Sequence, residues 1–261
     1  MIDLVVEEQL DELDPLRHLR DDPDLDSDRA GIVPAQPPSI LGQTIGLVFA
    51  GPSAGEVNGG DVAITLLVDA SPGCGGIAWP AGEVLSRYIA RRGSLEGRTV
   101  LELGSGTGLV GLVAGKMGAK VWITDQAPLL PIMQRNVATN DLSSRVHVAE
   151  LDWSGRGSPL PQDIPRPSLI LAADCVYFEP AFPLLVQTLA ELVPRGSLAD
   201  LSDHIEVLFC YKKRRKADKR FFTLLKREFT WTEVRVQVTD DPDRKVYARE
   251  AISLLRLARK C

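Results

Sequence analysis

The sequence predicts a doubly wound α/β fold, in which helices cover both faces of a mostly parallel sheet. Two observations lead to this prediction. From residue 98 onward, short apolar runs alternate with helix-like segments, a pattern typical of strand–helix–strand units. The first of these runs, residues 100–103, leads directly into a glycine-rich turn and then a helix. The chain of 261 residues, 44% of them hydrophobic, is long enough to bury one substantial core.

The predicted elements can be placed in chain order. Segment 40–70 alternates apolar and polar positions on either side of Gly59 and Gly60, which predicts a hairpin ahead of the main sheet. A helix at 81–90 leads toward the glycine-rich turn. Seven strands are then expected, near 98–103, 119–124, 145–149, 168–173, 205–211, 231–238 and 250–257. Helices are expected between them, near 108–117, 127–140, 180–193 and 215–228.

Charge is distributed unevenly and suggests a domain boundary. Residues 1–30 hold eleven acidic residues and three arginines, a net charge of −8, whereas the whole chain carries −5, so that the remainder carries +3. An acidic stretch with few aromatic residues and with Pro15 and Pro23 buries little surface. We therefore expect residues 1–39 to form a mobile, solubilising tail and residues 40–261 to form a single catalytic domain.

Cysteine and histidine usage predicts neither a disulfide framework nor a metal site. The four cysteines show no C-x-x-C spacing, and the three histidines are far apart in sequence. The amino terminus lacks the pattern of a signal peptide, and no apolar run approaches the ~20 residues needed to span a bilayer. We expect a soluble, cytoplasmic protein with no membrane partner, and a monomer by default.

The stretch 100–108 predicts a binding site for a nucleotide-like cofactor. Its glycines let the backbone approach a ligand, and the following helix offers unpaired N–H groups at its start. Gly106, Gly108 and Gly111 also match the G-x-G-x-x-G pattern of dinucleotide-binding folds. Glu102 argues against a dinucleotide, because its carboxylate lies beside the turn where a pyrophosphate would bind. S-adenosylmethionine carries a sulfonium and an amino group but no phosphate, so it is the cofactor that we expect.

Acidic and aromatic residues follow the next two predicted strands. Asp125 ends the second strand, where a carboxylate can accept protons from both ribose hydroxyls. The third strand is followed by Glu150, Asp152 and Trp153, which offer a carboxylate for an adenine amino group and a ring for packing. The sequence leaves open which of Glu150 and Asp152 meets the adenine.

The fourth strand ends in Ala173 and is followed by Asp174 and Tyr177, and the fifth ends in Tyr211. Because ligands of doubly wound sheets bind at the carboxyl ends of the strands, these side chains are expected to share one rim with the glycine-rich turn. The rim would combine an acid with two phenol rings.

Together, Trp79, the Glu102 glycine turn, Asp125, the pair Asp152 and Trp153, and the Asp-x-x-Tyr motif from Asp174 resemble the seven-β-strand protein-lysine methyltransferases of methyltransferase family 16. The resemblance covers roughly residues 40–258. It implies a Rossmann-like class I methyltransferase fold and conversion of S-adenosylmethionine to S-adenosylhomocysteine. It also implies that Asp174 and Tyr177 face the substrate lysine, and that the cofactor is bound by Trp79, Glu102, Gly104, Gly106, Asp125, Trp153 and Ala173, with Asp152 or Glu150 at the adenine.

A narrower resemblance within this family is carried by segments 104–111, 171–177, 181–185 and 211–218. It implies that the partner is a protein, namely translation elongation factor 1-alpha, modified on one of its lysines. Nucleic acid is not the expected substrate, since an Asn-Pro-Pro-Tyr type motif for base amino groups is absent after the fourth strand.

The expected chemistry needs an uncharged amine, whereas a lysine side chain has an ordinary pKa of about 10.4. Asp174 can anchor the arriving ammonium, and Tyr177 and Tyr211 can orient the amine through hydrogen bonds or ring contacts. Alignment of the two reactants supplies much of the remaining rate enhancement, and no metal is required.

Simpler interpretations exist for the same residues. Asp174 could cap the following helix, Tyr177 and Trp153 could be packing aromatics, and Trp79 could pack against the start of a helix. Other functions also stay open at this point: a methyltransferase acting on RNA or a small molecule, or a cofactor-binding interaction protein without activity.

The basic run at 212–220 also has more than one interpretation. It could be a solvated helix face, a nucleic-acid or nuclear-import patch, or a docking site for a protein substrate. We favour a role in substrate docking or in fixing the helix, because the run begins at the carboxyl end of a strand.

Overall fold

The structure is a computed structural model, and it describes residues 42–52, 60–70, 74–154, 163–195, 205–213, 218–234 and 251–260. The expected tail at 1–39 and Gly59 lie outside these residues. Positions 214–217 of the basic run, residues 235–238 of the predicted strand 231–238 and residue 250 of the predicted strand 250–257 also lie outside them.

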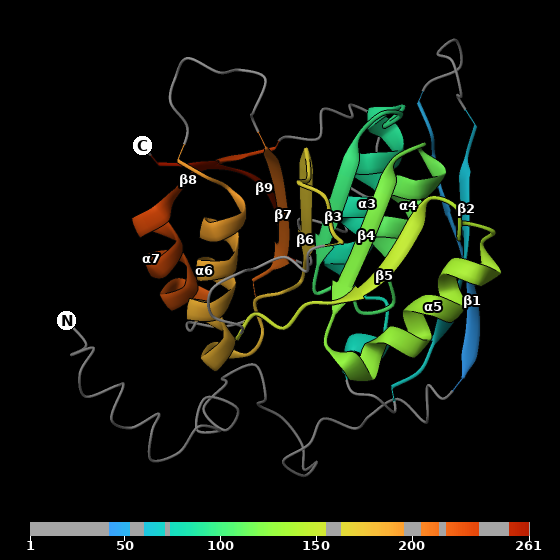
Figure 1. The fold of residues 1–261 in the computed structure, drawn as a ribbon, viewed down its shortest axis with the longest axis horizontal. Helices are drawn as coiled ribbons and strands as arrows, with labels where there is room; N and C mark the ends of the chain where they lie inside the picture. The colour runs from blue at the N-terminus through green and yellow to red at the C-terminus, as the bar shows by residue number, and fades with distance from the viewer. Residues whose placement is uncertain are drawn as a thin grey trace. The chain divides into compact units, whose positions relative to one another are not determined.

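A seven-stranded sheet forms the centre of the described domain, with the strand order β5-β4-β3-β6-β7-β9-β8 (Figure 1). Neighbouring strands are parallel from β5 to β7, and β9 runs antiparallel between β7 and β8. The predicted doubly wound, mostly parallel sheet is therefore confirmed. The strands are β3 (Thr99–Leu103), β4 (Lys120–Asp125), β5 (Val146–Glu150), β6 (Leu169–Ala173), β7 (Glu206–Lys212), β8 (Phe229–Glu233) and β9 (Ile252–Arg259).

Helices cover both faces of this sheet and enclose two apolar cores. The helices α3 (Pro80–Arg92), α4 (Leu109–Lys116) and α5 (Leu130–Thr139) pack on one face, and α6 (Phe182–Leu192) and α7 (Asp218–Glu228) pack on the other. Two predicted helices begin with a 3₁₀ turn, η3 (Ala127–Leu129) before α5 and η4 (Glu179–Ala181) before α6. Prolines in the first turns of these segments explain this, because proline lacks an N–H and fixes φ.

The predicted hairpin is confirmed as a separate two-stranded antiparallel sheet, β1 (Gln43–Phe49) and β2 (Val62–Val68). Alternate residues of β2, including Ile64 and Leu66, are buried in the core shared with α3, α4 and α5. The period of two in the sequence thus sets which face of β2 is buried.

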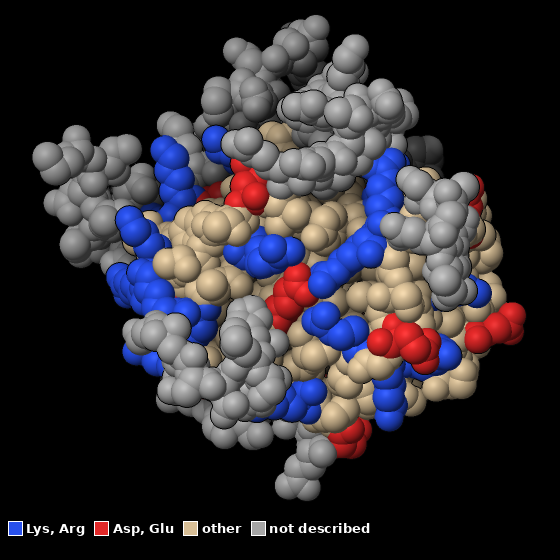
Figure 2. Space-filling model, turned by 90° about the horizontal axis from the view of Figure 1, so that it is seen from above, with Lys and Arg blue, Asp and Glu red and all other residues tan. Residues whose placement is uncertain are grey.

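A cluster of charged side chains lies at the amino ends of the parallel strands. Glu206, the first residue of β7, has one carboxylate oxygen 2.7 Å from the Arg92 guanidinium and 3.5 Å from that of Arg98, and its other oxygen lies 3.3 Å from Arg256. Figure 2 looks onto this end from above and shows basic side chains around a few acidic ones. Burial raises the pKa of Glu206, but the three guanidinium groups outweigh it, so this pKa lies below its ordinary value.

We expect Glu206→Gln to lower the melting temperature, because three guanidinium groups lose their shared carboxylate. The pKa of Glu206 is lower in the folded protein than in the unfolded chain. Its ionised carboxylate therefore stabilises the folded protein at a pH above the unfolded-state pKa, and this stabilisation is lost as the pH falls through the folded-state pKa. The difference between wild type and variant, followed by circular dichroism, should therefore shrink from about pH 7 to about pH 3. A difference that stays constant over this range would contradict the role given to Glu206.

Within the described part of the chain, no helix combines the length and the apolar character that crossing a membrane requires.

Candidate active site

The glycine-rich loop after β3 adopts a backbone that residues other than glycine rarely take. Gly104, Gly106 and Gly108 have φ values of 59°, 56° and 83°. A Cβ atom on Gly106 would lie 2.5 Å from the carbonyl oxygen of Gly75, in η2 (Cys74–Gly76). A Cβ atom on Gly104 would lie 3.0 Å from the Cys175 Sγ and 3.2 Å from the Trp153 ring. The loop is thus closely flanked on two sides, and glycine is required at both positions.

Strand β4 fixes the other side of this loop through hydrogen bonds. The Ser105 N–H donates to the Thr124 carbonyl at 2.9 Å, and the Thr124 N–H donates to the Ser105 hydroxyl at 3.0 Å. The Gly106 N–H donates to the Asp125 carboxylate at 2.9 Å. The end of β4 therefore sets the shape of the loop, because these buried backbone groups have no water to bond.

Glu102 lies beneath the loop. Its side chain is buried, and its Oε2 accepts a 2.8 Å hydrogen bond from the Gly111 N–H, in the first turn of α4. Burial raises the pKa of Glu102 to about 8, although hydrogen bonds from Gly111 and Ser105 lower it. This carboxyl therefore provides a partner for a buried N–H group in the first turn of α4, which would otherwise be unpaired. Its contact with a cofactor stays a prediction.

Asp125 is half-buried at the end of β4, beside the loop. One carboxylate oxygen accepts from Gly106, and the other accepts from the Gln126 N–H at 2.7 Å. Burial raises the pKa of Asp125 and both hydrogen bonds lower it, but burial has the larger effect, so this pKa lies above its ordinary value. Because a carboxylate offers about four acceptor positions, two neutral backbone donors leave room for ribose hydroxyls. The predicted ribose contact is compatible with this geometry and stays a prediction.

The segment after β5 lies next to the loop as predicted. Trp153 is half-buried and packs against Gly104. The Asp152 carboxylate is exposed and accepts the Ser154 N–H at 2.9 Å, in a local turn. Glu150 is exposed at the end of β5, in register with Asp125. The geometry therefore leaves both carboxylates as candidates for the adenine.

Asp174 is buried and has a φ of 58°, a left-handed conformation that an aspartate adopts at some energetic cost. Its N–H donates to the Cys210 carbonyl at 2.8 Å, and its Oδ1 accepts weakly from the Lys212 N–H at 3.4 Å. The interpretation of Asp174 as a helix cap is wrong, because η4 and α6 have Phe178 and Ala181 at their N-caps. Ala173, which ends β6, pairs with Cys210. Strain of this kind is typical of functional sites.

Exposed aromatic side chains border this part of the molecule. Among the described residues, the exposed large hydrophobic side chains are Val48, Trp79, Tyr177 and Phe178. Tyr177 and Phe178, 51% and 57% exposed, follow Asp174 in the same loop. Trp79 is the N-cap of α3, and its segment is continuous with η2, which touches Gly106. Tyr177 is therefore not a buried packing residue.

Tyr211 has a different environment. Its ring packs against Phe222 of α7, with ring centroids 4.8 Å apart, and against Phe209, at 6.4 Å. Burial raises the pKa of Tyr211, as do the charges of Asp218 and Glu233. Tyr211 is thus part of the aromatic cluster between β7 and α7, and its predicted role in orienting the amine stays a prediction.

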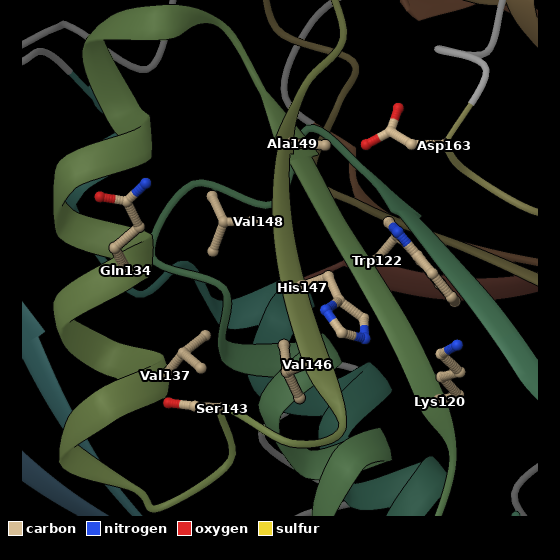
Figure 3. Close-up of a pocket in the computed structure, with 10 residues that line it drawn as sticks. All are labelled: Lys120, Trp122, Gln134, Val137, Ser143, Val146, His147, Val148, Ala149 and Asp163. Carbon is tan, nitrogen blue, oxygen red and sulfur yellow. The ribbon is translucent and has the colours of Figure 1, made fainter.

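An open pocket of about 600 Å³ lies away from the glycine-rich loop, around the edge strand β5 (Figure 3). The side chains that line this pocket lie on both sides of β5, with Gln134 and Val137 on one side and Trp122 and His147 on the other. Such a pocket is the open edge of the sheet rather than a chamber for a ligand, and none of the predicted site residues lines it.

Three residues that shape the loop are not part of the predicted site, namely Gly75, Cys175 and Asn136. Asn136 donates from Nδ2 to the Thr107 carbonyl of the loop at 2.9 Å. A sequence signal for it exists, since Asn136 and Asn140 lie four residues apart on the face of α5 that carries Met133 and Val137. Polar residues on a buried helix face require hydrogen-bond partners.

Comparison with known proteins identifies the family. The sequence model of a family described as lysine methyltransferase matches residues 60–228, more than half of the chain. The chain belongs to this family. The predicted family and enzyme class, a protein-lysine N-methyltransferase, are confirmed. The family match does not support the alternative interpretation of the glycine-rich turn as a dinucleotide-binding site.

Individual members of the family are similar over most of their length. The chain is 39% identical to the protein-lysine N-methyltransferase EFM6 of Saccharomyces cerevisiae over 215 residues, covering 72% of this chain and 82% of the relative. It is 37% identical to the protein N-lysine methyltransferase METTL21A of Danio rerio over 184 residues, covering 69% and 78%. It is 32% identical to the EEF1A lysine methyltransferase 3 of Xenopus tropicalis over 159 residues, covering 59% and 70%.

The raised pKa of Glu102 predicts a specific pH dependence of stability. Between about pH 5 and about pH 8 the folded protein retains a proton on Glu102 that the unfolded chain loses, so the stability falls as the pH rises through this window. Glu102→Gln keeps an oxygen acceptor for Gly111 and removes the titration. The free energy of unfolding is measured in urea for the variant and for wild type. The value for the variant minus the value for wild type should increase from about pH 5 to about pH 8, because only wild type loses stability in this window. Parallel pH profiles would show that Glu102 is ionised in the folded state.

Proposed function

We propose that this enzyme transfers a methyl group from S-adenosylmethionine to a lysine side chain of translation elongation factor 1-alpha. The observation that carries the chemistry is the strained, buried Asp174 one strand away from the glycine-rich loop, followed by the exposed Tyr177. The protein substrate is supported by the relative from Xenopus tropicalis, whose name gives EEF1A as the protein that it methylates.

The residues around the loop fit S-adenosylmethionine. Asp125 offers acceptor positions for ribose hydroxyls, the Trp153 ring lies against Gly104, and the Glu102 carboxyl lies beneath the loop, bonded to the first turn of α4. When bound, this cofactor supplies a methyl group on a positively charged sulfur. We assign its binding to the predicted set of Trp79, Glu102, Gly104, Gly106, Asp125, Asp152, Trp153 and Ala173.

The residues that receive the lysine follow β6. An ammonium group that reaches this rim is attracted by the Asp174 carboxylate, which lies beside the end of β7 and accepts weakly from the Lys212 N–H. The nitrogen must lose a proton before it can attack, because a lysine with its ordinary pKa of about 10.4 has no lone pair to donate at neutral pH. Tyr177 follows three residues later in the same loop and is exposed, so we assign to its hydroxyl the role of orienting the amine while the proton leaves to water. We keep Tyr211 as a third candidate that orients the amine from β7.

The same proposal includes the organisation of the chain. We place the catalytic domain at residues 40–261 and the acidic tail at 1–39, and we expect a monomer that acts in the cytoplasm.

Asp174→Asn is expected to abolish methylation while S-adenosylmethionine still binds with nearly wild-type affinity in calorimetry. Asparagine tolerates the left-handed backbone, so the substitution removes the charge and keeps the fold. Asp141→Asn is the matched control, because Asp141 has a φ of 57° but is exposed in the turn after α5. Loss of cofactor binding in Asp174→Asn would show that Asp174 has a structural role instead.

The substrate is tested by incubating the purified enzyme with tritiated S-adenosylmethionine and elongation factor 1-alpha produced in bacteria. We expect label in the protein band, recovered as methyl-lysine after hydrolysis, and no label with Asp174→Asn. A parallel reaction with cell extract, with and without nuclease, distinguishes the alternatives. Label lost to nuclease would identify RNA as the substrate, and absence of label despite cofactor binding would contradict the proposed protein substrate.

A further inference from the structure

Two buried asparagines, Asn136 of α5 and its C-cap residue Asn140, bond the backbone of the hairpin strand β2. Asn140 accepts from the Thr65 N–H at 2.9 Å and donates to the Thr65 carbonyl at 2.7 Å. Asn136 accepts from the Leu67 N–H at 2.7 Å and donates to the Leu67 carbonyl at 3.1 Å. Thr65 and Leu67 are alternate residues of β2, so these backbone groups lie on one edge of the strand. Two side-chain amides thus take the place of a neighbouring strand.

The remaining hydrogen bond of each amide goes to a different place. The second Nδ2 proton of Asn140 goes to the carbonyl of Asn136, 2.7 Å away and within α5. The second Nδ2 proton of Asn136 goes to the carbonyl of Thr107, 2.9 Å away in the glycine-rich loop. Of the two asparagines, Asn136 alone therefore connects the hairpin with that loop.

The bond to Thr107 fixes one peptide unit of the loop at both ends. The carbonyl of this unit belongs to Thr107 and accepts from Asn136, whereas its N–H belongs to Gly108 and donates to the Ser105 carbonyl at 2.7 Å. Gly108 has a φ of 83° and is the N-cap of α4. Because a buried carbonyl without a partner is costly, loss of the Asn136 amide favours rotation of this unit and so changes where the loop and the helix start lie.

We infer that Asn136 is a positioning residue for cofactor binding, and that the β1–β2 hairpin supports the cofactor loop through it. The inference rests on the proposed function insofar as the ligand of the loop is S-adenosylmethionine. Asp125 holds the loop from β4 through Gly106, and Asn136 holds it from α5 through Thr107. The loop is therefore supported from two elements.

Asn136→Ala and Asn140→Ala form a matched pair. Each variant removes one buried amide and two hydrogen bonds to the backbone of β2. Only Asn136→Ala also removes the hydrogen bond to the Thr107 carbonyl. We expect both to lower the melting temperature and to speed hydrogen exchange in β2. Only Asn136→Ala should speed hydrogen exchange of the loop amides at 105–111 without cofactor, and weaken calorimetric affinity for S-adenosylmethionine by about tenfold. Its KM for the cofactor should rise with little change in kcat.

Equal loop exchange and equal affinity in the two variants would overturn the inference and leave Asn136 as an anchor of the hairpin only. If the wild-type enzyme shows no affinity for S-adenosylmethionine, the proposed function fails, whereas the exchange comparison still decides the role of Asn136. Should Asn136→Ala not fold, the pair Asn136→Ser and Asn140→Ser replaces it, because serine leaves a hydroxyl that offsets part of the lost polarity. The same contrast in loop exchange is then expected.

Discussion

The glycine-rich loop between β3 and α4 exists in its left-handed conformation only because neighbouring elements bond its buried backbone groups. Thr124 and Asp125 hold it from β4, and Glu102 holds the first turn of the helix that follows. Each of these groups sits at the end of a strand or helix whose own position is fixed by the apolar cores. The site is therefore a consequence of sheet order, since β4 and β6 lie on either side of β3.

This dependence explains what could be predicted from the sequence. The elements from residue 98 onward follow from local patterns: strand-like runs, helix periods and turn residues. The end of each strand then locates Glu102, Asp125 and Asp174 on one rim, because the carboxyl ends of parallel strands share an edge. The enzyme class followed from several motifs taken together, and the family match confirms it.

The rest could not be predicted, because it depends on contacts between residues far apart in the chain. Asn136 and Leu67 are separated by 69 positions, and nothing near either of them indicates the other. The capping interpretation of Asp174 failed because the 3₁₀ turn η4 places Phe178 at the N-cap, and it is the pairing with β7 that holds the aspartate. The position of Tyr211 in the sequence predicts that it lies on the rim, whereas the direction of its ring follows from the packing of α7.

The antiparallel strand β9 has a consequence for the order in which the chain can assemble. β9 lies between β7 and β8, although it follows both in sequence. During synthesis, β7 therefore has an unpaired edge, and β8 lacks its partner in the sheet, until residues 252–259 have left the ribosome. Such unpaired strands invite pairing with other chains, so the nascent domain is exposed to aggregation until β9 takes its place between β7 and β8.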